Sequence, residues 1–278
     1  MNDYLYLLDE VSDIARHAAA IIVRIYERAD TAVRYKADNS PVTEADQAAN
    51  QYIVERLQAL TPQWPVLSEE STIPDTAERQ RWHAFWLVDP LDGTREFIAG
   101  NGQFTVNIAL IVNGKPVLGV VHVPVSGVCY RGCQQQAEKL LPSGQIQALR
   151  CRPASTPVVL LASGRNGLSG TEQLRQAIRL HRGPVATRLL GSSLKLCLIA
   201  DGIADIYPRL APTYEWDTAA GHAIVNAAGG AVVDRHFKAL RYNKDTLLNP
   251  DFLALGQPPE QWYFLQQHLN EGDKDGSG

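Results

Sequence analysis

The feature that most constrains this chain is a short apolar run ending in two closely spaced acids, Asp89 and Asp92. Residues 85–88 are aromatic and branched, a pattern typical of a buried strand. Pro90 and Gly93 are turn-forming residues, so the pattern predicts that the chain folds back here on one tight turn. Two carboxylates held that close repel each other, and a hard divalent cation such as Mg²⁺ would remove the repulsion. The stretch therefore predicts half of a metal site, although Asp-Pro and Asp-Gly are also common surface turns.

The composition excludes several classes of protein. With 278 residues, 45% of them hydrophobic, the chain suffices for one large or two moderate globular domains. A formal net charge of −4 argues against a nucleic-acid polymer as partner, and no obligate protein partner is indicated. No stretch approaches the ~20 apolar residues of a transmembrane segment, and the first residues do not resemble a signal peptide. The cysteines form no metal-binding pattern, which predicts reduced thiols in a cytoplasmic protein, compatible with peripheral association with the inner membrane.

The first part of the chain predicts two helices. Apolar residues recur at helical spacing over residues 3–28. Thr43 is a favourable N-cap, with Asp46 three residues later, and this pair marks the start of a second helix. The polar segment 35–43 before it is predicted to be a mobile loop. Asp46 lies in the first turn, where the helix dipole favours its ionised form, so helix stability alone would also explain this acid.

Beyond the acidic stretch the pattern becomes strand upon strand, and then strand alternating with helix. Apolar runs on either side of the Asn-Gly pair at 113–114 predict a hairpin, and the polar segment 134–144 is predicted to interrupt the strands. The later alternation predicts an α/β arrangement. We therefore expect an N-terminal α+β metal-binding domain, a C-terminal α/β domain and a disordered tail, at residues 1–153, 154–270 and 271–278.

Four acidic residues share one predicted geometry, since each lies where a strand ends or a helix begins. Glu69 follows a short strand, Asp89 and Asp92 follow the apolar run, and Asp217 heads a helix of small residues. Each acid alone has an ordinary explanation, such as a solvated strand edge for the adjacent glutamates 69–70. Several acids converging on one point would instead form an oxygen-rich metal site.

Together these motifs resemble the dispersed signature of the Mg²⁺-dependent, lithium-sensitive phosphatases. That superfamily contains inositol monophosphatase, fructose-1,6-bisphosphatase and 3′(2′),5′-bisphosphate nucleotidase. The order and spacing match over nearly the whole chain, and several loops are similar to the bacterial bisphosphate nucleotidases. The shared motifs are Asp46, Ser68-Glu-Glu-Ser71, Asp89-Pro-Leu-Asp-Gly-Thr94 and Trp216-Asp-Thr-Ala-Ala220, and the nucleotidase-like segments are Lys36–Thr43, Arg95–Leu110 and Gly191–Lys195.

The resemblance implies a layered α/β (α+β) fold, a five-layered αβαβα sandwich with the active site between its two halves. It implies hydrolysis of the 3′-phosphate of a small phosphorylated nucleotide, 3′-phosphoadenosine 5′-phosphate, in support of sulfur assimilation. An inositol monophosphatase is the alternative. Phosphatases that form an aspartyl-phosphate use Asp-x-Asp-x-Thr, which differs from the spacing here. A non-catalytic nucleotide sensor is disfavoured because every expected ligand is present.

Carried over residue by residue, the resemblance implies two Mg²⁺ ions in the active site. Glu69, Asp89 and the backbone carbonyl of Leu91 would hold the first ion. Asp89, Asp92 and Asp217 would hold the second, and a third, weaker ion would lie near Glu69. A pair of metals ~3.5–4 Å apart can stabilise both the attacking and the leaving oxygen of an in-line displacement.

The resemblance also implies catalytic and substrate-binding roles. Thr94, hydrogen-bonded to Asp46, and Glu69 would orient and deprotonate the attacking water. Arg209 suits a second phosphate, because its planar fork pairs with phosphate oxygens, although a surface ion pair would also explain it. Backbone amides that follow Asp92 can bind phosphate oxygens. The residues expected to contact substrate are Gly93, Thr94, Gly191, Ser192, Lys195, Arg209 and Asp217.

Overall fold

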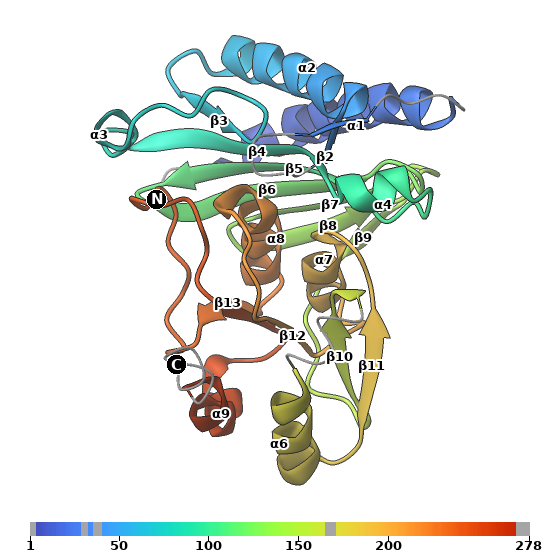
Figure 1. Ribbon diagram of the computed structural model, residues 1–278, viewed down its shortest axis with the longest axis vertical. Coiled ribbons are helices and arrows are strands. Elements are labelled where there is room, and N and C mark those ends of the chain that lie inside the picture. Colours follow the sequence, from blue (N-terminus) through green and yellow to red (C-terminus); the bar gives the residue numbers. More distant parts are fainter. Residues whose placement is uncertain (1–3, 29–32, 36–40, 165–170, 271–278) are drawn as a thin grey trace.

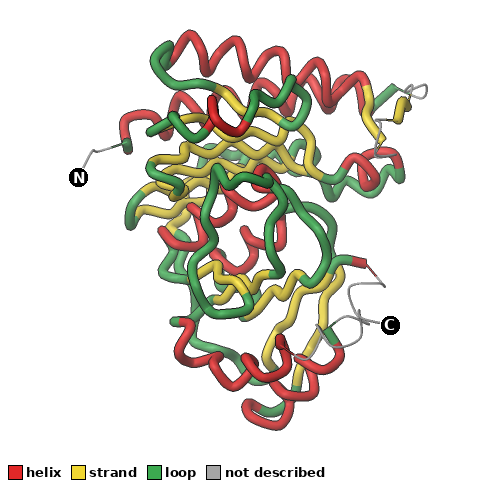
Figure 2. The backbone as a smooth tube through the Cα atoms, turned by 60° about the vertical axis from the view of Figure 1, so that its left-hand side comes forward, coloured by secondary structure: helices red, strands yellow, loops and turns green. Residues whose placement is uncertain are grey.

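A computed structural model describes residues 4–28, 33–35, 41–164 and 171–270 of the chain. Two β-sheets alternate with three layers of helices, which makes the molecule a five-layered αβαβα sandwich (Figure 1). The turned view in Figure 2 shows the same stacking, with helices at both ends and between the sheets. The expected fold class is therefore confirmed.

Two long helices form the outer layer on one side, and their apolar faces cover the larger sheet. The helix expected over residues 3–28 is confirmed for the described residues, where a short 3₁₀ turn runs into a long α-helix. Thr43 caps the next helix as predicted: its hydroxyl accepts a hydrogen bond from the Ala45 amide, and Asp46 accepts one from the Thr43 amide. These elements are η1 (Leu5–Leu7), α1 (Leu8–Tyr26) and α2 (Glu44–Leu60).

The segment expected to be a mobile loop, 35–43, is partly regular. β1 (Val33–Tyr35) pairs antiparallel with β2 (Pro41–Thr43), which leads directly into α2. Residues 36–40 of the expected loop lie outside the described residues.

Strands β3 to β9 form the larger sheet and lie in chain order. The β3–β4 pair is parallel, and each following pair is antiparallel. The predicted hairpin is confirmed, with φ of 52° at Asn113 and 69° at Gly114. The predicted interruption at 134–144 is wrong, because β8 pairs with β7 there, and its polar side chains are tolerated on a partly exposed strand. The strands are β3 (Val66–Ser68), β4 (Ala84–Asp92), β5 (Thr105–Val112), β6 (Lys115–Val123), β7 (Val128–Cys133), β8 (Gln136–Leu140) and β9 (Ile146–Ala148); the short helices beside them are α3 (Thr76–Arg79) and α4 (Thr94–Ile98).

Helices α7 (Leu194–Ala200) and α8 (Glu215–Ala227) form the middle layer (Figure 1). The core around them includes buried side chains from both sheets. Gly119 on β6 allows α8 to approach very closely, since a Cβ atom there would lie 2.1 Å from the carbonyl oxygen of Ala220. The helix headed by Asp217 was predicted from the sequence, and the N-termini of both helices lie at the candidate site described below.

The smaller sheet has the strand order β11-β10-β12-β14-β13. β10 is parallel to β11 and β12, and β14 is antiparallel to β12 and β13. The expected alternation of strands and helices is confirmed for β10 to α8. Helices on the far face of this sheet form the fifth layer. These elements are β10 (Val158–Ala162), α6 (Glu172–Arg182), β11 (Val185–Leu189), β12 (Ile206–Arg209), β13 (Ala231–Asp234), β14 (Phe252–Leu255), η2 (Pro259–Leu265) and α9 (Gln266–Asn270).

Among the described residues, no helix is both long and apolar enough to traverse a lipid bilayer. The cysteines are free thiols, as expected, with Cys129, Cys133 and Cys197 buried and Cys151 half-buried. The tail expected to be disordered, 271–278, lies outside the described residues.

Candidate active site

The two aspartates of β4 share one face of the sheet because the strand carries a β-bulge. Asp89 pairs with Asn107 and Asp92 with Thr105, so three steps along β4 match two along β5. The extra residue is accommodated next to Pro90, which has no amide hydrogen to give to the ladder. Side chains alternate between faces, and one additional residue brings both aspartates to the same side. The tight turn expected here is therefore wrong, since the strand continues as far as Asp92.

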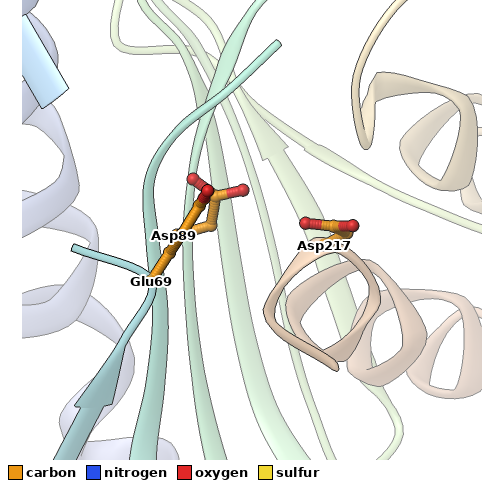
Figure 3. A group of neighbouring side chains, drawn as sticks. All are labelled: Glu69, Asp89 and Asp217. Carbon is orange, nitrogen blue, oxygen red and sulfur yellow. The ribbon is translucent and has the colours of Figure 1, made fainter. Parts of the chain in front are cut away.

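Three carboxylates from distant parts of the chain meet at the end of this sheet (Figure 3). Glu69 directly follows β3, Asp89 lies on β4, and Asp217 lies in the first turn of α8. One oxygen atom from each lies within 4.8 Å of the other two. The strand pairing brings the first two together, since the Glu69 amide donates to the Val88 carbonyl oxygen at 3.1 Å. Oxygen ligands at such spacing suit a hard divalent cation.

Burial and mutual repulsion make this cluster unfavourable as a set of bare charges. Burial raises the pKa of Asp89 well above its usual value, and the charges of Glu69 and Asp92 raise it further. Burial also raises the pKa of Asp217 well above its usual value, with Asp92 adding to the rise. A bound cation would offset both effects, so the chemistry of the donor set fits a divalent metal ion.

Asp92 lies beside the three-carboxylate group and connects the sheet to the middle layer. Its Oδ2 accepts a hydrogen bond from the backbone amide of Ser193, at the start of α7. Burial raises the pKa of Asp92, while the Lys195 ammonium and the Ser193 hydrogen bond lower it. The structure thus brings all four expected carboxylate ligands into one region, three of them within direct reach of a single ion.

The expected hydrogen bond between Thr94 and Asp46 is present, with Thr94 Oγ1 3.2 Å from Asp46 Oδ1. The same hydroxyl lies 3.4 Å from the carbonyl oxygen of Leu91. Asp46 Oδ2 accepts hydrogen bonds from the amide and the hydroxyl of Thr43, at 2.7 and 2.6 Å. Burial raises the pKa of Asp46, and the Thr43 hydrogen bonds offset part of that rise. The effect of the helix dipole on this acid is therefore opposed by its burial.

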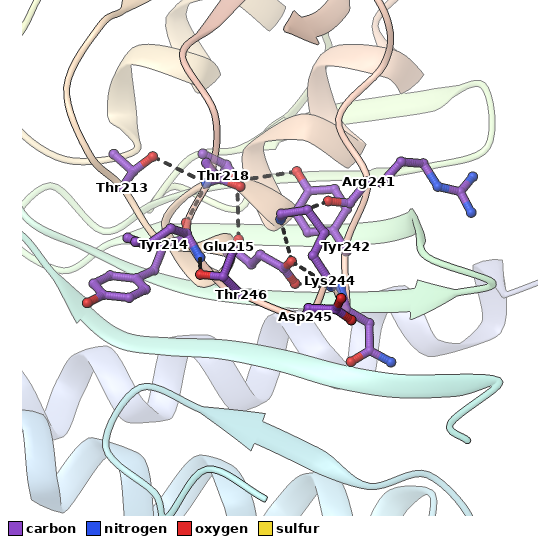
Figure 4. Close-up of polar contacts among 12 residues, drawn as sticks. Thr213, Tyr214, Glu215, Thr218, Arg241, Tyr242, Lys244, Asp245 and Thr246 are labelled. Atoms are coloured by element: carbon purple, nitrogen blue, oxygen red, sulfur yellow. Dashed lines mark hydrogen bonds and ion pairs between the residues drawn. The ribbon is translucent and has the colours of Figure 1, made fainter. Parts of the chain in front are cut away.

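Polar contacts hold the N-terminus of α8 (Figure 4). They include a hydrogen bond to Asp217 in its first turn. Asp217 Oδ2 accepts a hydrogen bond from the Tyr214 amide at 2.8 Å. The Asn249 side chain donates to the Tyr214 carbonyl oxygen at 2.6 Å. Glu215, which has no exposed surface, forms an ion pair with Lys244 and also accepts hydrogen bonds from backbone amides. The first turn of α8 is therefore anchored on both sides of the carboxylate that it presents.

A cavity of about 600 Å³ opens beside the carboxylates, between α4, the N-terminus of α7 and the end of β12. This volume lies in the range of small-molecule sites. Thr94 is absent from its lining, and the other residues expected to contact substrate line it: Gly93, Gly191, Ser192, Lys195, Arg209 and Asp217.

The two expected cationic contacts are both held by backbone carbonyls. The Lys195 ammonium donates to the carbonyls of Leu190 and Ser192 and lies 5.2 Å from the ring centre of Tyr207. Burial lowers the pKa of Lys195 to about 8. The guanidinium of Arg209 donates to two carbonyls of the following loop, at 3.1 and 3.2 Å. Lys195 therefore shapes the loop before α7 as well as adding charge to the cavity.

Sequence reasoning missed three residues of this region: Ser193, Asn107 and Tyr207. Ser193 and Asn107 are buried and hydrogen-bonded to each other, and Tyr207 lines the cavity. The available signal was an amide side chain inside an otherwise apolar strand, since residues 105–112 read Thr-Val-Asn-Ile-Ala-Leu-Ile-Val. A buried polar residue in such a strand needs a specific partner, and its partner here comes from a different layer.

The layered sandwich and its carboxylate cluster are those expected of the phosphatase superfamily that the sequence resembles. The model of the inositol monophosphatase family matches residues 6–269, and the chain belongs to this family.

Three of the relatives share the name CysQ. The 3′(2′),5′-bisphosphate nucleotidase CysQ of Escherichia coli O157:H7 is 47% identical over 248 residues, which cover 88% of this chain and 98% of the relative. The protein of the same name from Salmonella typhimurium is 47% identical over 249 residues, with the same coverage of 88% and 98%. The crystal structure of CysQ from Bacteroides thetaiotaomicron has a TM-score of 0.79 at 40% identity and covers 90% of this chain and 98% of that one.

Proposed function

We propose that this chain is a Mg²⁺-dependent phosphomonoesterase that converts 3′-phosphoadenosine 5′-phosphate to AMP and phosphate. The observation that carries the proposal is the meeting of Glu69, Asp89 and Asp217 beside a cavity of about 600 Å³. The substrate is suggested by the nucleotidases with which the chain shares 47% identity over most of its length. Removal of the 3′-phosphate from the product of sulfate transfer would support sulfur assimilation.

The carboxylates would hold two Mg²⁺ ions. Glu69, Asp89 and the carbonyl of Leu91 would provide one set of ligands, and Asp89, Asp92 and Asp217 the other. When bound, Mg²⁺ supplies positive charge that polarises phosphoryl oxygens and lowers the pKa of water. The raised pKa values of Asp89 and Asp217 in the metal-free protein are consistent with ligands that await a cation.

The residues around the ligands would orient the attacking water. Because the Thr94 hydroxyl gives its proton to Asp46, its lone pairs can accept a hydrogen bond from that water. Glu69 would accept the proton that the water loses. In the hydrolysis, the oxygen of water bonds to phosphorus while the 3′-oxygen of the ribose leaves and takes up a proton. Asp46 acts on Thr94 and is therefore a positioning residue.

The cavity would receive the rest of the nucleotide. Arg209 keeps one terminal nitrogen outside its described hydrogen bonds to the loop, and this nitrogen suits the 5′-phosphate. Lys195, which also lines the cavity, would add a second positive charge. Gly191 and Ser192, just before α7, would contact the ribose or its phosphates, and Gly93 the phosphate to be cleaved.

The test is phosphate release from 3′-phosphoadenosine 5′-phosphate and from inositol 1-phosphate, measured side by side. We expect faster release from the nucleotide with Mg²⁺, loss of activity in EDTA and inhibition by Li⁺. Faster hydrolysis of the inositol ester would favour an inositol monophosphatase instead. Trapping of a phosphoenzyme would overturn direct attack by water. The Asp89→Asn variant serves as the inactive control for contaminating phosphatases.

A further inference from the structure

Asn107 on β5 lies on the face of the larger sheet that carries Asp89 and Asp92, and the proposed chemistry gives it no role. It is the direct cross-strand partner of Asp89. Its neighbours at every second position, Ala109 and Ile111, pack into the middle-layer core, so the Asn107 side chain faces the same way. Its exposed fraction is 1%, which means that bulk water does not satisfy its amide group.

The oxygen of this amide already accepts a hydrogen bond from a residue at the start of the middle-layer helix α7. Ser193 Oγ lies 2.7 Å from Asn107 Oδ1 and donates to it. Thr105 Oγ1, 2.8 Å from Ser193 Oγ, can then donate to the serine. The backbone amide of the same Ser193 donates to Asp92. Asn107 therefore positions Ser193, the residue whose amide hydrogen-bonds to Asp92.

The nitrogen of the amide is in the opposite situation. Asn107 Nδ2 is buried and has no hydrogen-bond partner among the residues that the structure describes. A buried donor without an acceptor is unfavourable, and native proteins rarely tolerate one. Because Asp89 lies directly opposite on the same face, the acceptor is expected from the contents of the metal site.

We propose that Asn107 is a positioning residue of the metal site: its amide oxygen acts on Asp92, and its amide nitrogen acts beside Asp89. Through Oδ1 and Ser193 it fixes Asp92 against the start of α7. Through Nδ2 it donates to an oxygen beside Asp89 when the site holds its cation, either the carboxylate itself or a water next to it. The inference rests on the proposed Mg²⁺ dependence, and it does not depend on which phosphate ester is the substrate.

The test replaces Asn107 with leucine, which has nearly the same shape and no polar atoms. Leucine removes the unsatisfied Nδ2 donor, and the Ser193 hydroxyl, which loses its acceptor Oδ1, can donate to Thr105 Oγ1 instead, so the stability of the metal-free protein should change little. The half-saturating Mg²⁺ concentration should rise by about tenfold, as is typical when a partner of a metal ligand is lost. It is measured by calorimetric titration and by the Mg²⁺-dependent shift in Tm, and kinetics should show a lower kcat with KM for the nucleotide changed little.

Two further variants make the result decisive. Ser193→Ala removes the hydroxyl and keeps the amide hydrogen bond to Asp92, so it should shift the Mg²⁺ midpoint in the same direction by a smaller factor. Thr187→Val, which removes another buried and unpartnered hydroxyl on β11, should leave the midpoint unchanged. Wild-type Mg²⁺ midpoints in both Asn107→Leu and Ser193→Ala would overturn the proposal, and the serine variant alone decides if the leucine variant does not fold. A wild-type protein that binds Mg²⁺ but does not cleave the nucleotide would instead refute the proposed function.

Discussion

Asp89 is a residue whose charge opposes folding of the metal-free chain and would be a ligand in the metal-bound protein. Burial and the neighbouring carboxylates raise its pKa in the folded state. A group with a raised folded pKa favours the folded state at low pH, and this contribution is lost as the pH rises through that pKa. Asp89→Asn removes the charge and keeps an oxygen for the Leu91 amide, which donates to Asp89 Oδ1 at 3.0 Å.

We therefore expect Asp89→Asn to lower turnover by orders of magnitude and to stabilise the metal-free protein. At pH 8 its free energy of unfolding should exceed that of the wild type, because the wild type must then keep a charged carboxylate in a buried site beside other acids. Urea denaturation in EDTA at pH 5 and pH 8 measures the difference, which should widen with pH. A variant that is less stable at pH 8, or that keeps near-normal turnover, would remove Asp89 from the proposed role.

His222 predicts a pH dependence of the opposite sign. It is buried on α8, its Nδ1 lies 2.9 Å from the Tyr242 hydroxyl oxygen, and burial lowers its pKa from 6.5 to about 3. Between these values the unfolded chain binds more protons than the folded chain, so stability falls as the pH drops below about 6.5. The slope should approach ~1.4 kcal/mol per pH unit for this residue. His222→Gln, compared with the wild type by urea denaturation between pH 4.5 and pH 6.5, should show a shallower slope, and an unchanged slope would contradict the assignment.

At the scale of the elements, β4 shows what could be predicted from the sequence and what could not. The apolar run before Asp89 correctly predicts a buried strand, and Asp89 lies, as expected, in a cluster of carboxylates that could hold a metal ion. The predicted turn is wrong because proline and glycine are common to turns and to bulges, and only the pairing with β5 distinguishes them. The same long-range dependence hides Ser193, whose hydrogen-bond partners lie 86 to 101 residues earlier in the chain.

The packing of α8 on the larger sheet predicts that Gly119 is required for activity as well as for stability. A Cβ atom at this position would overlap the backbone of Ala220, which cannot move unless the helix moves. Gly119→Ala should lower the free energy of unfolding by about 1–3 kcal/mol, as overpacking typically does. Because α8 carries Asp217, the residual folded protein should also need more Mg²⁺ for half-maximal activity.

The control for this change is Gly144→Ala, since a Cβ atom at Gly144 meets nothing within 4 Å. Its φ of 83° makes alanine unfavourable there, so this variant separates backbone strain from a steric clash with α8. We expect Gly144→Ala to lose some stability and to keep the wild-type Mg²⁺ requirement. An unchanged Mg²⁺ requirement in Gly119→Ala would show that the helix position does not control the site.

At the scale of the whole molecule, the layered architecture was predicted from the family resemblance and from no local sequence pattern. Local patterns predicted the longer helices and most strands, but the stacking of five layers depends on which apolar faces meet. Strands β13 and β14 were not anticipated, because each has only four residues and is distinguished as a strand by its pairing with distant parts of the chain. The middle layer matters for the site because it places Asp217 opposite Asp89 on β4 and Glu69 just after β3.

A ligand set drawn from two layers predicts that Mg²⁺ stabilises the molecule as a whole. An ion that binds the folded state alone adds about 2.7 kcal/mol to the free energy of unfolding at a concentration of 100 times Kd. Because burial raises the pKa values of Asp89 and Asp217, protons compete with Mg²⁺ as the pH falls. The Mg²⁺-induced rise in Tm should therefore be larger at pH 8 than at pH 5.5.

Thermal unfolding with Mg²⁺ and with EDTA at both pH values measures this rise, with Asp89→Asn as the matched control. A rise of equal size in that variant would place the ion outside the proposed site, because Asp89, which belongs to both ligand sets, would then contribute nothing to its binding.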